Sequence, residues 1–378
     1  MRIGNLAPAA WVQRAAPAPA PAADPEQEQL VAARAGLVVN GAEPLNCEVP
    51  VSLLGGDVTP TARFYRRNHF PIPVLDEAAW RLDVTGMVHR PLSLGLPELT
   101  EMPAETMTVT LECAGNGRRM FRPEVPGEQW GFGAVSTAEW TGVPLTDVLR
   151  RAGIGPGARE VIFGGADRGT VDGAPQPIHF ERSLSVADAL ESSALLAYAM
   201  NGQPLPARHG YPLRLVVPGW YAVASVKWLS SIRVTDEPFG GFFQTQRYVY
   251  EWDRNGTEIR EPVRLQQIRA LITRPGSGQA LACGAIIVRG VAWSGAAPIE
   301  RVEVSLNHGS WQKARLVGVP AAHGWQQWEF LASGLSPGAA SIRARAADLA
   351  GQVQPERPEW NRRGYGANFI HEVVVQAR

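Results

Sequence analysis

The arrangement in this sequence with the clearest capacity for chemistry is a single thiol followed closely by two arginines. Residues 109–119 read VTLECAGNGRR, which predicts a strand that enters a glycine-containing turn, with Cys113 at the junction. A lone cysteine is most often a small buried apolar side chain. Here the nearby Arg118 and Arg119 would lower the pKa of the thiol. The segment therefore offers a nucleophile or a ligand for a soft metal.

Three other segments bring arginine and histidine side chains into turns. Residues 64–71 read FYRRNHFP, and residues 201–214 read NGQPLPARHGYPLR ahead of an apolar strand. Residues 360–365 read WNRRGY. Each segment alone is compatible with an ordinary solvated loop. Together the segments supply many arginine and histidine donors, one thiol and no paired carboxylates, a composition that suits a polyanionic ligand.

The elements that must position these segments are mostly short strands interrupted by glycine and proline. In the first part of the chain the pattern predicts strands at Trp80–Val84, Thr106–Leu111 and Glu160–Phe163. Helical patterns are confined to Pro144–Ala152 and Ser185–Ala189. This combination predicts an α+β domain.

Beyond about Arg260 the pattern changes to strands at regular spacing, which is typical of an all-β sandwich. Val302, Val304 and Leu306 alternate with polar residues, so one face of their strand is expected to pack and the other to meet water. The six predicted strands are Ala285–Trp293, Ile299–Asn307, Ala314–Val317, Gln326–Leu331, Ser341–Ala347 and His371–Gln376.

The predicted organisation has three parts. Residues 1–36 are predicted to be an Ala/Pro-rich tail, because Ala15–Asp24 alternates alanine with proline and favours extended geometry. Residues 37–260 form the α+β domain, and residues 261–378 form the sandwich. The three cysteines lie far apart in sequence, which excludes a disulfide framework and a C-x-x-C zinc site.

Composition excludes several classes of protein. The chain has 378 residues and is 45% hydrophobic and 19% charged, within the range of globular proteins. Lys plus Arg and Asp plus Glu are both 36, so the overall basic field used by nucleic-acid and anionic-membrane binders is absent. The longest apolar stretch, Leu215–Ala224, is shorter than a membrane helix and contains proline. A cytoplasmic protein that binds neither nucleic acid nor membranes is expected.

Five motifs make the sequence resemble the sulfite oxidase family of molybdenum-cofactor enzymes, over about Leu37 to Gln376. In that family the first domain holds a molybdopterin whose dithiolene binds molybdenum, and an immunoglobulin-like sandwich forms the homodimer. The motifs are RNH at Arg67–His69, CAGN at Cys113–Asn116, WxxGAxSTA at Trp130–Ala138, NGQPLP at Asn201–Pro206 and SVKWL at Ser225–Leu229.

The resemblance implies a role for each residue that matches a family motif. Cys113 would be the thiolate ligand of molybdenum. Residues implied to contact the cofactor are Arg67, Asn68, His69, Cys113, Asp167, His209, Arg214, Ser225 and Lys227. Residues implied to form the substrate pocket, where arginines would hold a small oxyanion, are Arg67, Arg118, Trp130, Tyr248 and Arg363.

The activity that the resemblance implies is oxidation of sulfite to sulfate by oxygen-atom transfer at an oxo-molybdenum centre. The electrons would pass to dioxygen or to an external carrier such as a cytochrome. Neither a haem nor a flavin domain is expected, because no segment resembles one. Cys47 and Cys283 are expected to serve packing only.

Two departures from the family pattern concern the pocket rim. Gly117 stands where many members have the first arginine of CAGNRR, and the loop before Trp130 is shorter than in animal relatives. Three alternative functions stay open. They are a nitrate reductase module, a reductase of S-oxides or N-oxides, and a non-catalytic interaction protein that uses the sandwich.

Overall fold

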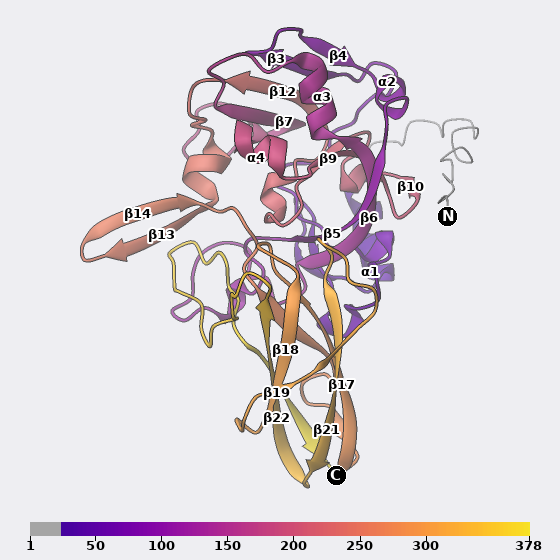
Figure 1. Cartoon of the computed structure of the whole chain (residues 1–378), viewed down its shortest axis with the longest axis vertical. Coiled ribbons are helices and arrows are strands. Elements are labelled where there is room, and N and C mark those ends of the chain that lie inside the picture. The colour runs from indigo at the N-terminus through magenta and orange to yellow at the C-terminus, as the bar shows by residue number, and fades with distance from the viewer. Residues whose placement is uncertain (1–23) are drawn as a thin grey trace.

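The computed structural model describes residues 24–378, and residues 1–23, which hold most of the Ala/Pro-rich stretch, lie outside the described part. An α+β lobe occupies one end of the molecule and a narrower β-sandwich the other (Figure 1). The predicted order, an α+β domain followed by an all-β sandwich, is confirmed.

One five-stranded sheet of the α+β lobe lies between the other sheet and the sandwich (Figure 1). Its strand order is β10-β9-β6-β5, with β11 also paired to β9, and every pairing is antiparallel. The strands are β5 (Glu105–Glu112), β6 (Val135–Pro144), β9 (Leu195–Met200), β10 (Gln203–Pro204) and β11 (Arg214–Val216).

The second sheet of this lobe has the order β4-β3-β12-β7-β8. Helix α3 (Leu145–Ala152) forms because Leu145, Val148, Leu149 and Ala152 make one buried stripe, and it ends at Gly153, whose φ is +68°. The other elements are β3 (Leu82–Gly86), β4 (Leu92–Leu94), β7 (Glu160–Gly169), β8 (Ile178–Ser185), β12 (Leu229–Thr235), α2 (Leu96–Thr100) and α4 (Val186–Glu191).

The described part of the predicted tail differs from the expectation of an extended segment. Residues Pro25–Arg34 form helix α1, with Asp24 as N-cap and proline at the first position. Ala32 is fully buried against the α+β lobe. Strands β1 (Val38–Gly41) and β2 (Asn46–Glu48) follow as an antiparallel pair.

A two-stranded arm leaves the molecule between the two lobes. It consists of β13 (Val249–Arg254) and β14 (Thr257–Pro262), and it projects to one side (Figure 1). A short π-helix, Phe243–Arg247, precedes it.

The sandwich packs a four-stranded sheet, β15-β17-β21-β20, on a five-stranded sheet, β16-β23-β22-β18-β19. Val302 and Val304 are buried in its core as predicted, whereas Leu306 is only partly buried and Ser305 is buried, so the predicted alternation ends at Val304. The strands are β15 (Arg269–Arg274), β16 (Ala280–Leu281), β17 (Gly284–Trp293), β18 (Ile299–Leu306), β19 (Gln312–Lys313), β20 (Arg315–Val317), β21 (Gln326–Leu335), β22 (Gly338–Asp348) and β23 (His371–Ala377).

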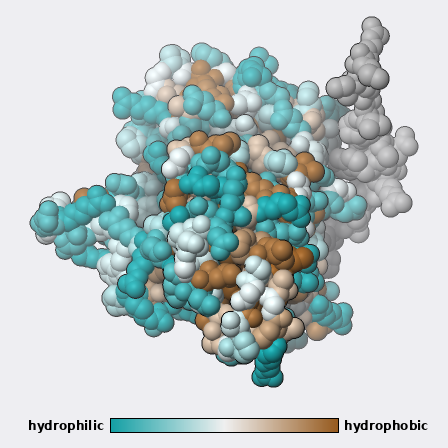
Figure 2. All heavy atoms as spheres, turned by 60° about the horizontal axis from the view of Figure 1, so that its bottom comes forward, coloured by the Kyte–Doolittle hydropathy of each residue, from teal (hydrophilic) through white to brown (hydrophobic). Residues whose placement is uncertain are grey.

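The two lobes share apolar packing. Leu271, Val291 and Trp293 of the sandwich belong to the same buried cluster as Leu111 and Val135 of the α+β lobe. The surface seen from the sandwich end mixes apolar and polar side chains (Figure 2). Within residues 24–378, no helix is long and apolar enough to cross a membrane.

Candidate functional site

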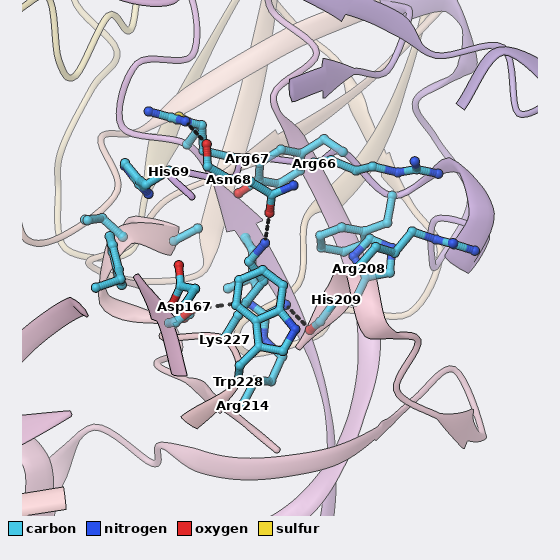
Figure 3. Close-up of a pocket in the computed structure, with 18 of the residues that line it drawn as sticks. Arg66, Arg67, Asn68, His69, Asp167, Arg208, His209, Arg214, Lys227 and Trp228 are labelled. Carbon is cyan, nitrogen blue, oxygen red and sulfur yellow. Dashed lines mark hydrogen bonds between the residues drawn. The ribbon is translucent and has the colours of Figure 1, made fainter. Parts of the chain in front are cut away.

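A pocket, here called the inner pocket, lies where several loops of the α+β lobe converge (Figure 3). Its polar lining comes from segments up to about 180 residues apart, as the 2.6 Å contact between His69 and Tyr248 shows. The polar and sulfur-bearing lining residues are Tyr65, Arg66, Arg67, Asn68, His69, Cys113, Asp167, Arg208, His209, Arg214, Ser225, Lys227, Trp228 and Tyr248.

Cys113 reaches this pocket because strand β5 ends at Glu112 and the chain then turns. The amide of Cys113 donates to the carbonyl of Ala134 at 2.9 Å, and its own carbonyl accepts from the amide of Asn116 at 2.8 Å. Burial raises the pKa of the thiol, while the charge of Arg67 and the amide of Gly115 act to lower it. The thiol side chain is thus fixed by the backbone and faces a cationic pocket.

At one end of the inner pocket two guanidinium groups share a carboxylate from helix α1. Glu28 contacts Nη1 of Arg66 at 2.9 Å and Nη1 of Arg208 at 2.7 Å. Nε and Nη2 of Arg66 and Nε of Arg208 are buried without a partner among the described residues. Burial lowers the pKa of Arg66, and the Glu28 charge opposes that shift. These unsatisfied N–H groups can donate hydrogen bonds to an additional anion.

Arg214 and His209 are held by backbone carbonyls. The guanidinium of Arg214 donates to the carbonyls of His209 at 3.0 Å and Ser225 at 3.3 Å and lies over the ring of Trp140. Its Nε is buried without a partner in the described part of the chain. The ring Nε2 of His209 lies 3.1 Å from the carbonyl of Thr61, to which it donates. Burial and neighbouring cations keep the pKa of His209 well below its usual value, so the ring is neutral.

Asp167 and Lys227 place opposite charges on another wall. Burial raises the pKa of the Asp167 carboxyl and lowers the pKa of the Lys227 ammonium, and each charge moderates the shift of the other. Lys227 donates to Oδ1 of Asn68. Oδ1 of Asp167 is buried with no hydrogen-bond partner among residues 24–378, so it can accept from a ligand N–H.

His69 and Tyr248 form a hydrogen-bonded pair at 2.6 Å between Nε2 and the phenol oxygen. Burial, followed by the charge of Arg67, keeps the pKa of His69 well below its usual value. Burial also raises the pKa of Tyr248. The tyrosine therefore stays protonated and donates to the neutral imidazole.

A second, wider pocket, here called the outer pocket, adjoins the first because both include Arg67 and His69. It adds two further cations, Arg247 and Arg363, and two carboxylates, Glu128 and Asp172. Nε of Arg363 lies 2.9 Å from Oε1 of Glu251. Arg67 and His69 therefore form a wall common to the two pockets.

The structure brings most of the predicted site residues together. Ten line the inner pocket, and Arg363 lines the outer pocket. The ten are Arg67, Asn68, His69, Cys113, Asp167, His209, Arg214, Ser225, Lys227 and Tyr248.

The remaining two, Arg118 and Trp130, line neither pocket. Trp130 is fully buried in the shared cluster. Arg118 lies over the ring of Tyr365 and donates to the carbonyls of Arg363 and Glu128, each at 3.1 Å. It therefore supports the backbone that carries Arg363.

Three pocket cations escaped the sequence reasoning: Arg66, Arg208 and Arg247. Each is the immediate neighbour of a residue that was identified, namely Arg67, His209 or Tyr248. In irregular backbone, adjacent side chains can face the same cavity. The cations next to Arg67, His209 and Tyr248 could therefore have been proposed as pocket residues from the sequence.

The donor set fits the group that the resemblance implies. The unsatisfied guanidinium atoms suit a phosphate, Asp167 suits the N–H groups of a pterin, and Cys113 suits a soft metal. Within the described residues no three His, Cys, Asp or Glu side chains cluster as a metal site. A metal held here would thus take its other ligands from a cofactor.

Comparisons with known proteins agree with this geometry. Residues 69–243 match the oxidoreductase molybdopterin binding domain, and residues 261–378 match the Mo-co oxidoreductase dimerisation domain. The structure superposes on the sulfane dehydrogenase SoxCD from Paracoccus pantotrophus with a TM-score of 0.78, at 28% identity, covering 88% of this chain and 84% of that one.

Relatives of known name extend over most of the chain. Mitochondrial sulfite oxidase of Rattus norvegicus is 36% identical over 99% of this chain and 71% of its own length, whereas this chain spans 65% of the Mus musculus protein. Sulfite oxidase of Arabidopsis thaliana is 35% identical over 90% of this chain and 94% of its own length. Nitrate reductase [NADH] 1 of Oryza sativa is 34% identical, but this chain spans 40% of it. With the thiol, the anion-binding arginines and both domains in place, the chain belongs to the sulfite oxidase family of molybdopterin-binding oxidoreductases.

Proposed function

We propose that this protein oxidises sulfite to sulfate, with the balance of sulfite plus water giving sulfate, two protons and two electrons. The observation that carries the proposal is the joining of two pockets, one with the Cys113 thiol and one with arginines, through Arg67 and His69. A molybdopterin bound in the inner pocket supplies the oxygen-atom transfer and accepts the electron pair.

The inner pocket would hold that cofactor by its charges and its unsatisfied donors. Cys113 ligates the metal, and Arg66, Arg208 and Arg214 bind the phosphate end. Asp167 accepts hydrogen bonds from the ring system. Asn68, His209, Ser225 and Lys227 complete the contacts, in part by fixing the loops that line the pocket.

The outer pocket would bind and orient the substrate. Arg67, Arg247 and Arg363 come from three distant segments and present cations to the same space. Two or three guanidinium groups suit a small dianion, because their hydrogen bonds are charge-assisted. Arg118 acts one step away by holding the carbonyl of Arg363.

Tyr248 lines the inner pocket beside His69, which lines both pockets, and its phenol would offer a hydrogen bond to a substrate oxygen there. The protonated phenol donates to Nε2 of the neutral His69, so neither side chain is negatively charged. An incoming oxyanion could accept the phenol hydrogen bond in place of His69.

The remaining features of the proposal concern assembly and electron flow. Residues 261–378 match a dimerisation domain, which supports a homodimer, the commonest oligomer of soluble proteins. Dioxygen or an external carrier such as a cytochrome would take the electrons. The cytoplasmic location and the lack of haem and flavin stay predictions, and the visible spectrum of the purified protein tests the second of these.

The experiment is anaerobic addition of sulfite to the purified, cofactor-loaded protein. Sulfite is expected to change the visible absorbance of the molybdenum centre and to yield one sulfate for each pair of electrons. Nitrate added to the chemically reduced protein provides the comparison. Reoxidation by nitrate without a response to sulfite would replace this proposal by the nitrate reductase alternative.

A further inference from the structure

The strand that carries Cys113 is bonded to the C-terminal part of the chain as well as to its own sheet. The carbonyl of Thr110 accepts from Nε2 of Gln266 at 2.9 Å, and the amide of Thr110 donates to the carbonyl of His323 at 2.8 Å. Just beyond the thiol, the carbonyl of Ala114 accepts from the amide of Gly366 at 3.0 Å. Residues on both sides of Cys113 are therefore anchored outside the cofactor-binding lobe.

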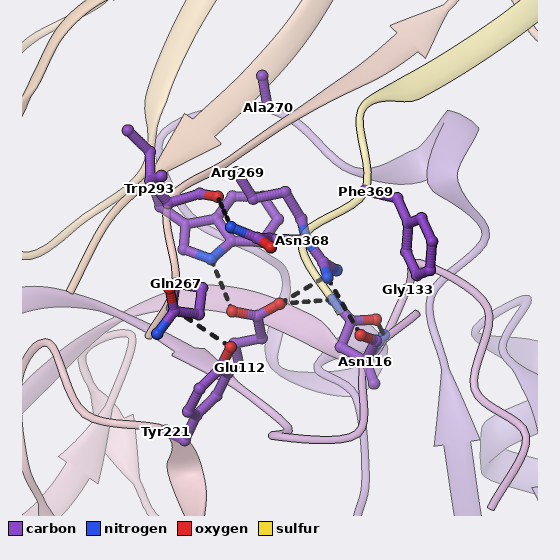
Figure 4. Close-up of polar contacts among 12 residues, drawn as sticks. Glu112, Asn116, Gly133, Tyr221, Gln267, Arg269, Ala270, Trp293, Asn368 and Phe369 are labelled. Atoms are coloured by element: carbon purple, nitrogen blue, oxygen red, sulfur yellow. Dashed lines mark hydrogen bonds and ion pairs between the residues drawn. The ribbon is translucent and has the colours of Figure 1, made fainter. Parts of the chain in front are cut away.

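A buried ion pair joins the two lobes at the residue before the thiol (Figure 4). Oε1 of Glu112 lies 3.2 Å from Nη1 of Arg269 on β15, and both side chains are 1% exposed. Oε2 of Glu112 accepts from the indole N–H of Trp293 on β17 at 2.9 Å. The carboxylate thus receives donors from two neighbouring sandwich strands.

The same carboxylate controls the turn that follows the thiol. Nδ2 of Asn116 donates to Oε1 of Glu112 at 2.9 Å, and Oδ1 of Asn116 accepts from the amide of Ala134 at 3.1 Å. Nη2 of Arg269 donates to the carbonyl of Asn116 at 3.2 Å. Glu112 and Arg269 therefore bracket the turn Cys113–Asn116 at both ends.

Close packing excludes other positions of this turn. Gly117 has φ +85°, and a Cβ there would lie 2.9 Å from the carbonyl oxygen of Ala367 and 3.2 Å from Nη2 of Arg269. The backbone of the turn touches the C-terminal segment directly, with no room for a side chain.

We propose that the sandwich domain positions the thiol of Cys113, and that Glu112, Arg269 and Trp293 are the positioning residues. This deepens the proposed function, because a metal ligand must be held at one place. The domain matched as a dimerisation domain, residues 261–378, thus also holds the turn that carries the metal ligand. The placement is a property of the chain itself and can be measured without cofactor.

The three cysteines allow a test in the cofactor-free protein by alkylation with iodoacetamide, followed residue by residue by mass spectrometry. Cys283 is exposed and marks the maximal rate, whereas Cys47 is fully buried and marks global opening. Cys113 lines the inner pocket and is 6% exposed, so it reports the turn. A global loss of stability raises labelling of Cys47 and Cys113 together, while a displaced turn raises Cys113 alone.

Two variants perturb the support to different degrees. Trp293→Phe removes one donor to Glu112 and keeps an aromatic side chain, and Arg269→Met removes the charge and both of its contacts. Arg289→Met is the matched control, since Arg289 lies on the outer face of the sandwich in an exposed ion pair with Glu329. We expect Cys113 labelling to rise about tenfold in Arg269→Met and less in Trp293→Phe, with Cys47 unchanged.

Unchanged labelling of Cys113 in both variants would overturn the proposal, and so would a parallel rise of Cys47 and Cys113. Because Arg269→Met leaves Glu112 as a buried unpaired charge, that variant can fail to fold, and Trp293→Phe then decides. In the loaded protein the same variants should alter the thiolate-dependent absorbance of the metal. If the variants displace the turn but the parent protein does not react with sulfite, the result would contradict the proposed function and leave the positioning proposal intact.

Discussion

Cys113 lies among groups whose effects on its thiol oppose one another. Burial favours the protonated form, while Arg67 and the Gly115 amide favour the thiolate. A bound metal tips this balance, because coordination removes the proton outright. Without a metal the protonated thiol is therefore favoured, because burial is the largest of these effects.

The first prediction concerns this ligand. Cys113→Ser should keep the fold and bind the pterin, because the guanidinium, amide and carboxylate donors of the inner pocket are unchanged. It should lose sulfite turnover, because oxygen is a harder and less covalent donor than sulfur. Pterin content and steady-state rate measured on the same sample test this, and full activity in the variant would remove Cys113 from the site.

The second prediction concerns the outer pocket. Arg363→Met should raise the Michaelis constant for sulfite roughly ten- to a hundredfold, because one charge-assisted bond to an anion contributes on the order of 1.5–3 kcal/mol. Arg362→Met is the matched control, since that neighbour makes only long ion pairs with Asp253 and Glu258, at 3.8 and 3.9 Å. Equal constants for the two variants would place Arg363 outside the substrate site.

Sequence motifs identify most of the pocket residues, because a basic loop and a thiol at a strand end are local patterns. Arg118 shows the limit of that reasoning. Its place in the CAGNGRR segment suggested a pocket residue, yet its guanidinium is held by the carbonyls of Arg363 and Glu128. Those partners lie 245 and 10 residues away, and no local pattern encodes which of them it meets.

At the scale of elements, helix α1 contributes to the inner pocket although the Ala/Pro-rich composition before it predicts an extended tail. It follows the Ala/Pro stretch directly, and it supplies Glu28 as the counter-charge for Arg66 and Arg208. The capping pattern was present, with Asp24 before Pro25 and acidic residues in the first turn. The Ala/Pro-rich composition of the preceding residues nevertheless led to the prediction of a tail up to residue 36.

The third prediction follows from that counter-charge. Glu28→Gln should destabilise the cofactor-free protein by about 3 kcal/mol, because removal of one partner leaves buried guanidinium groups uncompensated. The cost should be smaller in the loaded protein, where an anionic phosphate takes over the compensation. Thermal unfolding of both forms tests this, with the exposed Glu26→Gln on the same helix as control. An equal loss in the two forms would argue that the cofactor phosphate lies elsewhere.

Strand prediction was most complete in the sandwich, where the hydrophobic alternation is regular; in the first lobe it missed β6, β8, β9 and β12 as well as the projecting arm. In the arm, β14 exposes four of its six side chains, and β13 exposes two and buries Val249 and Glu251, so neither strand gives a regular apolar pattern. The turn that joins them, Asn255-Gly256, has positive φ at both residues, 56° and 79°. That dipeptide is the strongest short-range hairpin signal, and it would have located the arm.

For the whole molecule, three histidines with lowered pKa values contribute to the response to acid. Burial keeps the pKa values of His69 and His209 well below the usual value and lowers that of His371 to about 4. A histidine with a depressed folded pKa contributes stability above its unfolded pKa and loses it as pH falls toward the folded value. The cofactor-free protein should therefore lose stability between about pH 6.5 and pH 4.

The fourth prediction isolates one of these groups. Nδ1 of His371 accepts from the amide of Ile272 at 3.0 Å, and an asparagine oxygen can take over that bond. His371→Asn should flatten the acid limb by about 1.4 kcal/mol per pH unit, the value for one proton. Denaturant unfolding at several pH values measures the slope. An unchanged slope would assign the acid sensitivity to other groups.

The fifth prediction concerns assembly. Ile287 and Leu331 face each other in register on β17 and β21 and are 50% and 63% exposed. Large exposed apolar side chains on a sheet face are typical of an interface. Sedimentation at micromolar concentration should give twice the chain mass of 40.9 kDa, and Leu331→Asp should reduce it toward the single chain. A monomeric parent protein would contradict the homodimer.

The bond between Arg118 and the carbonyl of Arg363 spans 245 residues, and it implies an order of events during synthesis. At about 5–20 residues per second, roughly 10–50 s separate emergence of the thiol from emergence of the segment that closes over it. Until then the nascent pocket has neither its outer arginine nor its sandwich support. The pocket therefore lacks these contacts until the residues that supply them, up to Arg363, have been synthesised.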